Sequence, residues 1–336
     1  MMTAITDQFK KLSLDTVCQK LCENKNTLIV FHIRPDADAV GSAFALKELL
    51  RVMGIPSYCA CSDEIPERLR FLSDGMQGSV LLEDGLALDC ERVISVDSAS
   101  PSQLGAMFQR LHKNIDIMID HHASGSPYAD NYVDSSASAT GEIVYQIAQR
   151  LCEMGELDGI PPRVLNCVYA AISSDTGGFR YANATPKSLR IAAELVEAGV
   201  DTAEINRQIF DAKPLKQIKA EGEAIKRLRF FADGEIASTS LPYSVKKELE
   251  LSDEHLGTLI DVPRSVYGVQ IAFAVKQESE AGEFRVSMRS ATDFDVAAVC
   301  AAFGGGGHKR AAGCSVVANS VEEAEEKILA EIYKRM

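Results

Sequence analysis

The chain has 336 residues, more than one compact core usually holds and a length that suits two domains. Its hydrophobic content of 46% and charged content of 25% are ordinary for a globular protein, and no run approaches the ~18 apolar residues of a membrane span. The formal net charge of −13 disfavours long polyanions as partners, because duplex binding depends on many lysine and arginine contacts. We therefore expect no membrane and no long duplex nucleic acid among its partners, and any phosphate chemistry to involve small anions.

The start of the chain and its cysteines point to a reducing compartment. Residues 1–11 are polar and mixed in charge, without the apolar segment of a secretory signal, so we expect a cytoplasmic protein. The nine cysteines are an odd number and include no Cys-x-x-Cys pair. Reduced thiols explain this pattern better than a disulfide framework or a zinc site.

Strand and helix patterns alternate through the first two thirds of the chain. We expect strands at 27–31, 57–61, 92–96 and 115–119, and helices at 14–26, 39–53, 137–154, 162–173, 186–199 and 201–210. Such alternation is typical of a parallel sheet with helices on both faces. The fold class is therefore α/β, with a doubly wound, mostly parallel sheet in an N-terminal domain of residues 1–212. In such sheets ligands bind beyond the carboxyl ends of the strands.

The pattern changes after residue 212. Lys213-Pro214 opens a charged helical stretch to about residue 226, and we place a linker at 213–222. Beyond it we expect strands at 227–232, 235–240, 267–275, 283–290 and 313–317, and helices at 295–302 and 321–334. These hairpin-like pairs predict a smaller, mixed α/β C-terminal domain of residues 223–336.

The first chemical cluster follows the first expected strand. His32 stands at the strand tip, and Asp36 and Asp38 lie in the following turn, which Pro35 stiffens. One imidazole and two carboxylates within seven residues suit a divalent ion such as Mn²⁺ or Mg²⁺. A helix-capping aspartate beside a surface histidine is the plain structural alternative.

Three further clusters follow other apolar segments. Asp97 follows 93–96, where a lone aspartate is also an ordinary cap or turn residue. Asp120-His121-His122 follows 115–119 and is the stronger signal, since a carboxylate that holds a ligating imidazole is common at metal sites. Asp175 ends an apolar helix before Thr176-Gly177-Gly178, a turn that either aims this carboxylate or simply ends the helix.

Charge balance favours a metal site over four unrelated aspartates. Asp36, Asp38, Asp97 and Asp175 carry four negative charges, which two divalent cations would cancel. Without metal, four converging carboxylates would repel one another or take up protons. The set therefore suggests a two-metal site, at which paired ions activate water and stabilise a phosphoryl group.

The expected C-terminal domain carries a run of four glycines, Gly304–Gly307, followed by His308, Lys309 and Arg310. Consecutive glycines allow backbone N–H groups to converge on an anion, although glycine runs are usually flexible loops. Arg285, Ser287 and Arg289 share one face of the strand expected at 283–290. This combination favours a phosphate-binding surface made by Arg285, Arg289, Gly305, Gly306, Gly307 and His308.

The ordered motifs together resemble the DHH phosphoesterase superfamily. The match covers His32-x-x-x-Asp36-x-Asp38, Asp97, Asp120-His121-His122 and Asp175, and Gly304–His308 resembles the glycine-rich motif of its DHHA1 domain. Length, the two-domain plan and the run from Asp175 to Tyr181 are most similar to the branch of bifunctional oligoribonucleases and pAp phosphatases, the nanoRNases.

The resemblance implies a ligand set and roles for each motif. One metal would be held by His32, Asp36 and Asp97, and the other by Asp38, Asp97, His121 and Asp175. Asp120 would support the site, His122 would face the substrate as a catalytic residue, and Arg289 and His308 would contact a phosphate or terminal nucleotide. The resemblance also implies two Mn²⁺ ions, with Mg²⁺ or Co²⁺ as substitutes.

The expected function is metal-dependent hydrolysis of small nucleotide phosphoesters by a hydroxide that bridges two metals. The substrates would be short oligoribonucleotides or dinucleotides, cleaved to mononucleotides, and 3′-phosphoadenosine 5′-phosphate (pAp), cleaved to AMP; a homodimer is compatible with this plan. Three alternatives stay open: a pyrophosphatase or polyphosphatase, a nucleotide-binding sensor without turnover, and an exonuclease of long strands. The net charge disfavours the last of these.

Overall fold

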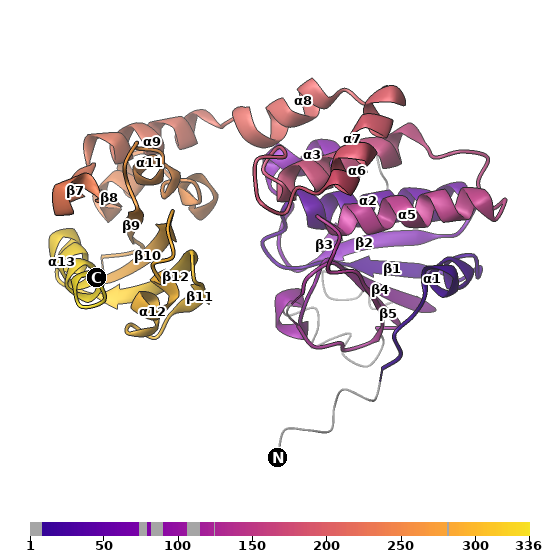
Figure 1. The fold of residues 1–336 in the computed structure, drawn as a ribbon, viewed down its shortest axis with the longest axis horizontal. Helices are drawn as coiled ribbons and strands as arrows, with labels where there is room; N and C mark the ends of the chain where they lie inside the picture. Colours follow the sequence, from indigo (N-terminus) through magenta and orange to yellow (C-terminus); the bar gives the residue numbers. More distant parts are fainter. Residues whose placement is uncertain (1–8, 74–78, 82–89, 106–114, 124, 281) are drawn as a thin grey trace, which may run out of the picture. The chain divides into compact units, whose positions relative to one another are not determined.

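The computed structural model describes residues 9–73, 79–81, 90–105, 115–123, 125–280 and 282–336. The chain divides between Ala212 and Lys213 into two compact units (Figure 1). Residues 213–222, which we expected to form a linker, lie in the second unit and mostly belong to helix α9 (Leu215–Lys226). The reason is packing, because Ala220 and Ala224 on one side of α9 are buried against the second sheet and its neighbouring helices.

The first unit is built on a sheet whose described strands all run parallel. Their spatial order is β3 (Ser79–Leu81), β2 (Ser57–Cys61), β1 (Thr27–Val30), β4 (Arg92–Val96), β5 (Ile117–Asp120) and β6 (Asp130–Val133). The order reverses between β1 and β4, which is the switch point of a doubly wound sheet. The predicted doubly wound fold is thus confirmed, and β3 and β6 are additional edge strands that the sequence pattern did not indicate.

Helices cover the sheet of the first unit. They are α1 (Leu14–Leu21), α2 (Ala37–Val52), α3 (Arg70–Ser73), α5 (Thr140–Glu153), α6 (Pro162–Asp175), α7 (Pro186–Glu197) and α8 (Thr202–Asn206), with short turns at Glu67–Leu69, Pro101–Leu104 and Arg207–Asp211. Helices α2, α5 and α6 pack against one another over one face of the sheet (Figure 1). On the opposite face, Leu28 and Val30 are buried with Leu104. The central strands are mostly apolar because both of their faces are covered.

One glycine sets the spacing between α2 and α6. A Cβ atom at Gly41 would lie 2.6 Å from the carbonyl oxygen of Cys167, so only glycine allows the two helices to pack this closely. This contact matters for the site, because Asp38 lies on the first turn of α2 and Asp175 is the last residue of α6.

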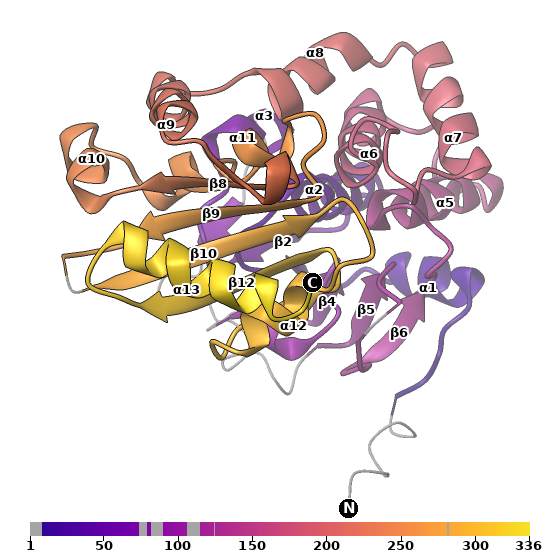
Figure 2. The ribbon, with the colours of Figure 1, turned by 60° about the vertical axis from the view of Figure 1, so that its left-hand side comes forward.

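The second unit contains a mixed sheet, as predicted (Figure 2). Its strand order is β11 (Gly306–His308), β12 (Ala311–Val317), β10 (Glu283–Ser290), β9 (Ile271–Gln277), β8 (Ile236–Leu241) and β7 (Arg229–Phe231). Only the β8–β9 pair among these is parallel. The remaining elements are α9, α10 (Tyr243–Glu248), α11 (Asp261–Arg264), α12 (Val296–Ala301) and α13 (Val321–Tyr333), with short turns at Ala232–Gly234 and Asp253–Leu256.

The two faces of the second sheet differ. Side chains such as Phe273 and Met288 point to one face and form a core with α12 and α13. On the other face, α9 and α11 bury Ala272 and Ala274 of β9. The part of that face made by β10, β12 and β11 carries exposed or half-buried residues, Arg285 and His308 among them.

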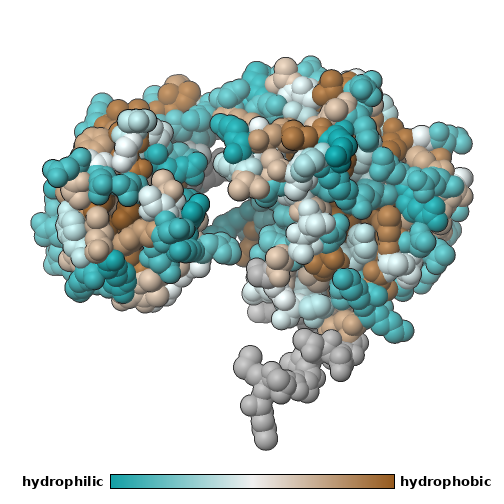
Figure 3. All heavy atoms as spheres, in the orientation of Figure 1, coloured by the Kyte–Doolittle hydropathy of each residue, from teal (hydrophilic) through white to brown (hydrophobic). Residues whose placement is uncertain are grey.

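The visible surface is mostly hydrophilic, with several separate small hydrophobic patches (Figure 3). Among the described residues, every helix is too short or too polar to cross a bilayer. The nine cysteines are all free thiols.

Candidate metal centre

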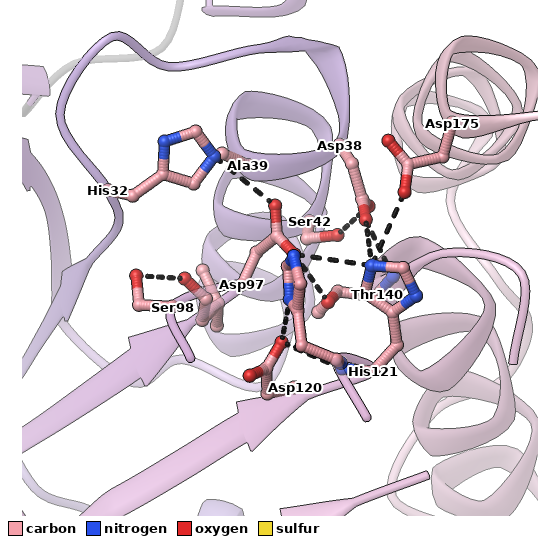
Figure 4. A network of polar contacts seen from close by, with 12 residues as sticks. His32, Asp38, Ala39, Ser42, Asp97, Ser98, Asp120, His121, Thr140 and Asp175 are labelled. Carbon is pink, nitrogen blue, oxygen red and sulfur yellow. Dashed lines mark hydrogen bonds and ion pairs between the residues drawn. The ribbon is translucent and has the colours of Figure 1, made fainter. Parts of the chain in front are cut away.

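The carboxyl ends of three neighbouring strands form one side of the site. His32 follows β1, Asp97 follows β4, and Asp120 ends β5 just before His121. Because β1, β4 and β5 are adjacent in the sheet, these side chains converge (Figure 4). Asp97 has a φ of +53°, a left-handed conformation that is uncommon for residues other than glycine and that clusters at functional sites.

The N-terminus of α2 forms the next part of the site. Asp36 is the N-cap, and its Oδ1 accepts hydrogen bonds from the backbone N–H groups of Asp38 and Ala39, each 3.0 Å long. The same oxygen lies 3.7 Å from Nε2 of His32. Asp36 therefore does cap helix α2, as the structural alternative predicted. The same hydrogen bonds hold its carboxylate beside the imidazole of His32, so the capping role is compatible with metal binding.

Asp38 is fully buried and is held by the N-terminus of a second helix, α5. Its Oδ1 accepts hydrogen bonds from Ser42 Oγ and from the backbone N–H of Gly141, each 2.9 Å long. Its Oδ2 accepts a 2.7 Å hydrogen bond from the backbone N–H of Thr140. A Cβ atom at Gly141 would lie 2.4 Å from that of Ala171, so this close approach requires glycine.

Sequence reasoning missed these supporting residues. Ser42, Thr140 and Gly141 do not resemble metal ligands, yet they fix the position of Asp38. The usable signal was a Thr-Gly pair within the start of an expected helix, since free N–H groups at a helix N-terminus bind carboxylates.

The first potential metal-binding group consists of His32, Asp36 and Asp97. Nε2 of His32 lies 3.5 Å from Oδ2 of Asp97. Nδ1 of His32 is 2.8 Å from the carbonyl oxygen of Ile33, and a proton donated there directs Nε2 at the carboxylates. Burial by itself lowers the pKa of His32, but its hydrogen bonds to Asp36 and Asp97 raise the pKa to about 11. Without metal, a proton on Nε2 thus takes the place of a cation.

The second group consists of Asp38, His121 and Asp175. Nε2 of His121 lies 3.3 Å from Oδ2 of Asp175 and 3.8 Å from Oδ2 of Asp38. Nδ1 of His121 lies 3.3 Å from the carbonyl oxygen of Ala137, which fixes the ring with Nε2 toward the carboxylates. Figure 4 shows Asp175 approaching this ring from α6.

Asp97 lies between the two groups. Its Oδ2 faces His32, whereas its Oδ1 lies 3.8 Å from Nε2 of His121. The Thr140 hydroxyl donates a 2.9 Å hydrogen bond to Oδ1, which restrains the carboxylate in this orientation. One carboxylate with an oxygen directed at each group has the geometry of a bridging ligand.

Asp120 orients His122. Its Oδ1 accepts a 2.7 Å hydrogen bond from Nδ1 of His122 and a 2.8 Å bond from the backbone N–H of His121. That hydrogen bond to Asp120 raises the pKa of His122 to about 9, although burial opposes it. The His122 side chain is 36% exposed, so its ring can meet a substrate while Asp120 stays buried.

The electrostatics of the site favour cations. Burial, followed by the charges of Asp97 and Asp175, raises the pKa of Asp38 well above its usual value. Burial, followed by the charges of Asp36 and Asp97, raises the pKa of Asp175 to about 8. Oxygen and imidazole donors that are buried or partly buried, prearranged and short of positive charge fit divalent metals. The donor set therefore fits the metals that the sequence implied.

A cavity of about 240 Å³ adjoins His122 and Asp120. It lies over β5 and β6, and its wall includes Met118, Asn131 and Lys11. The combination of apolar, amide and cationic groups beside the metal ligands gives room for part of a small organic ligand.

The glycine run of the second unit differs from our expectation. The N–H groups of Gly304 and Gly305 donate to the carbonyl oxygens of Ala301 and Cys300, and Gly304 has a φ of +72°. These bonds close helix α12 in a Schellman motif, so both N–H groups are unavailable to an anion. Gly306 and Gly307 belong to strand β11 instead of a loop. The prediction of a converging anion nest at Gly304 and Gly305 was therefore wrong.

Glycine is still required at two positions for packing. A Cβ atom at Gly305 would lie 2.3 Å from the carbonyl oxygen of Gly313, and one at Gly307 would lie 2.6 Å from that of Ala311. His308, at the end of β11, is exposed.

Arg285, Ser287 and Arg289 share the partly open face of β10, as their spacing predicted. Along β10 the residues between them, Val286 and Met288, are buried, whereas Arg285 is exposed and the other two are half-buried. Arg285 lies 3.8 Å from Glu278, and Arg289 donates to the carbonyl oxygen of Met288.

Two family models match the chain. The model described as "DHH family, N-terminal domain" matches residues 26–172, and the model described as "DHHA1 domain" matches residues 240–335. The first match contains His32, Asp36, Asp38, Asp97, Asp120, His121 and His122, and the second contains Arg285, Arg289 and His308.

Curated relatives are similar along nearly the whole chain. The protein named "Bifunctional oligoribonuclease and PAP phosphatase NrnA" from Thermus thermophilus is 30% identical over 312 residues, which cover 92% of this chain and 89% of that protein. The "Probable bifunctional oligoribonuclease and PAP phosphatase NrnA" from Streptococcus mutans is 30% identical, over 96% of this chain and 97% of that protein.

A solved structure supports the fold. The exopolyphosphatase-related protein from Bacteroides fragilis aligns with a TM-score of 0.85 and 23% identity, over 96% of this chain and 95% of its own. At this identity the likeness establishes the two-unit fold alone.

Proposed function

The chain belongs to the DHH family and carries that family's DHHA1 domain, and from this premise we propose that it hydrolyses small nucleotide phosphoesters. The proposed substrates are short oligoribonucleotides, cleaved to mononucleotides, and pAp, cleaved to AMP. The names of the Thermus and Streptococcus relatives support both substrates. The reaction class, hydrolysis of a phosphoester, rests on the family and on the donor set of the site.

The observation that carries the proposal is the placement of Asp97 between two ligand groups. His32 and Asp36 lie on one side, and Asp38, His121 and Asp175 lie on the other. We assign these residues to two divalent cations, with Mn²⁺ as the proposed metal and Mg²⁺ or Co²⁺ as substitutes. Two such cations would activate a water molecule and balance the charge that develops on the phosphoryl group.

The chain's own groups hold this arrangement in place. The helix N-termini of α2 and α5 fix Asp36 and Asp38 through backbone N–H groups, and carbonyl oxygens fix the rings of His32 and His121. The centre therefore needs little rearrangement when substrate binds, which is the condition for strong electrostatic stabilisation of a transition state.

His122 is assigned to the substrate. Its hydrogen bond to Asp120 keeps a proton on Nδ1 and presents Nε2 outward. With its pKa raised to about 9, the ring is protonated at neutral pH in the metal-free protein. A protonated His122 can donate a hydrogen bond to a phosphoryl oxygen or to the leaving oxygen. The adjoining 240 Å³ cavity can take part of the nucleoside.

Recognition of the rest of the substrate is assigned to the second unit. Arg285 and Arg289 supply the cations, His308 supplies an imidazole, and Gly306 leaves the strand surface without a side chain. Gly305 and Gly307 would act on binding only indirectly, because the absence of their side chains allows this segment to pack closely against β12. Exposed cations of this kind select phosphates and orient them.

A substrate panel with purified full-length protein and Mn²⁺ tests the proposal. We expect dinucleotide and pAp to be hydrolysed, with release of mononucleotides and of phosphate, and a 24-mer RNA and pyrophosphate to be poor substrates. Turnover of pyrophosphate alone would replace the proposal with the pyrophosphatase alternative. Processive degradation of the 24-mer would contradict the restriction to small substrates, and binding without turnover of any of them would indicate a sensor.

A further inference from the structure

The partly open face of the second sheet carries two separated rows of basic side chains. In the register of β11, β12 and β10, His308 lies opposite Ala311, which lies opposite Arg289. These directly opposed residues share one face, so Arg289 and His308 flank a small alanine. They form the first row, defined by Arg289 and His308.

The second row lies further along β10. Arg285 is directly opposite Lys276 of β9 and Ser315 of β12. With about 3.4 Å per residue, the four-residue step from Arg289 to Arg285 separates their Cα atoms by about 13 Å. The second row, defined by Lys276 and Arg285, therefore lies toward the other end of β10 and is separate from the first row.

The row between them has no large side chain. It consists of Gly306, Gly313, Ser287 and Ala274 across β11, β12, β10 and β9. Ala274 is buried beneath the helices, and Gly313 and Ser287 are half-buried. A floor of glycine and serine between two cationic rows lets a flat or extended ligand lie against the sheet.

The second row is electrostatically costly by itself. Like charges directly opposite each other on neighbouring strands destabilise a sheet, and Lys276 and Arg285 are such a pair. Lys246 lies in the same cluster, where it contacts Asp253 at 2.7 Å and Glu278 at 3.0 Å. Three cations thus face two carboxylates, and Glu278 is shared between Lys246 and Arg285.

Lys276 is the least compensated member of this cluster. It is half-buried, and among the described residues no carboxylate forms an ion pair with its ammonium group. Burial lowers its pKa, and the charges of Arg285 and Lys246 act in the same direction, whereas the charges of Glu278 and Asp253 oppose this shift. A bound anion would relieve this repulsion, so an anion-binding role explains why Lys276 and Arg285 stand opposite each other.

We propose that Lys276 and Arg285 form a second phosphate subsite, which a phosphate of an oligonucleotide occupies about two nucleotides from the phosphate at Arg289 and His308. This inference rests on the proposed function and deepens it. A molecule as short as pAp has no phosphate that far along a strand. The second row therefore favours oligonucleotides over pAp, and it separates the two proposed substrates by length.

The test is a ratio of specificity constants. For the full-length protein with Mn²⁺, kcat/KM is measured for a 5′-phosphorylated trinucleotide and for pAp in the double variant Lys276→Met and Arg285→Gln. Methionine keeps the apolar stem of Lys276, and the variant removes like-charge repulsion, so its Tm should not fall. We expect the trinucleotide-to-pAp ratio to fall about tenfold, mainly through KM of the trinucleotide.

Two further readouts make the result decisive. The salt dependence of kcat/KM for the trinucleotide should become shallower in the double variant, because a phosphate contact has been removed. The matched control is Lys334→Met, at an exposed lysine that follows the last residue of α13 and pairs with Glu331, and its ratio should equal that of the original chain. In contrast, Arg289→Ala should weaken the binding of both substrates.

An unchanged ratio in the double variant, or equal losses for both substrates, would overturn the second subsite. Neither result would touch the proposed function, since both substrates would still be hydrolysed by the original chain. Failure of the original chain to hydrolyse either substrate would instead overturn the proposed function itself.

Discussion

The metal centre of the first unit and the cationic face of the second unit use charge in opposite ways. At the metal centre, Asp38 and Asp97 are almost fully buried, and backbone N–H groups or a hydroxyl fix their oxygens. On the sheet face, the side chain of Arg285 is 52% exposed, and its ion pair with Glu278 is long. Buried charges are expensive to leave unpaired, whereas exposed ones are screened by water and salt.

This difference suggests which property of the reaction depends on each unit. In the proposed function, the prearranged centre in the first unit would determine whether phosphoester hydrolysis occurs at all. The basic side chains of the second unit would contribute modest, salt-sensitive binding free energy and would determine which substrates are preferred. Changes at the first should therefore remove turnover, and changes at the second should alter KM and selectivity.

The largest effect is expected at Asp38. Replacement by asparagine removes a buried negative charge from the second ligand group and should lower kcat by at least about 1,000-fold. In the metal-free protein the substitution relieves the repulsion that raises the pKa of Asp38, but it also turns an amide NH2 group toward the backbone N–H groups of Thr140 or Gly141, so kcat and not Tm is the readout. Asp158→Asn, at an exposed position, is the control, and substantial Mn²⁺-dependent turnover by Asp38→Asn would refute this assignment.

The next largest effect is expected at Asp120. Asparagine cannot accept the Nδ1 proton of His122 with the same charge, so the ring loses its orientation and its raised pKa. We expect kcat to fall about 10- to 100-fold while the metal content stays at the level of the original chain. Loss of metal together with activity would show that Asp120 acts on the ligands and not through His122.

A substitution at Arg289 tests the comparison in the second unit, where we expect an effect on binding and not on turnover. Arg289→Ala should raise KM for dinucleotide and pAp about tenfold at low salt, with kcat changed by less than about threefold. The effect should shrink as ionic strength rises, because the arginine is partly exposed. A fall in kcat comparable to that of Asp120→Asn would place Arg289 in the chemistry and blur the division between the units.

Metal-free stability should depend on pH in a definite direction. The raised pKa values of Asp38 and Asp175 penalise their charged forms in the folded state, so stability is lost as pH rises above their unfolded values of about 4. The raised pKa values of His32 and His122 add stability that is complete below about 6.5 and is lost as pH rises through about 9 and above. All four groups act in the same direction.

Thermal unfolding with a chelator should therefore give a higher Tm at about pH 6 than at about pH 9. Added Mn²⁺ should raise Tm more at the higher pH, because bound cations replace the protons. Asp38→Asn should show a weaker pH dependence than the original chain. A metal-free Tm that rises with pH over this range would contradict the electrostatic description of the site.

Much of this division could be read from the sequence. His32, Asp97 and Asp120 follow strongly apolar strands, and parallel strands bring their carboxyl ends to one edge. The alternation of β10 likewise predicted that Arg285 and Arg289 share a face. These predictions succeed because the two-residue period of a strand and the direction of the strand determine where each side chain points.

Other parts depend on contacts that no local pattern records. The polar edge strand β6 and the support of Asp38 by Thr140 and Gly141 arise only when distant segments pack together. The glycine run was misread because its glycines serve the end of α12 and the close β11–β12 pairing. The four glycines indicated that many backbone conformations are possible in this segment. Only tertiary packing determines which of these conformations it adopts.

The central claim is a two-cation centre bridged by Asp97. The most direct test is anomalous diffraction from crystals of the full-length protein grown with Mn²⁺. The structure predicts two peaks per chain about 3.5–4 Å apart, one beside His32 and Asp36 and the other beside His121 and Asp175, each in contact with one oxygen of Asp97. A single peak, or two peaks that share no contact with Asp97, would contradict this account.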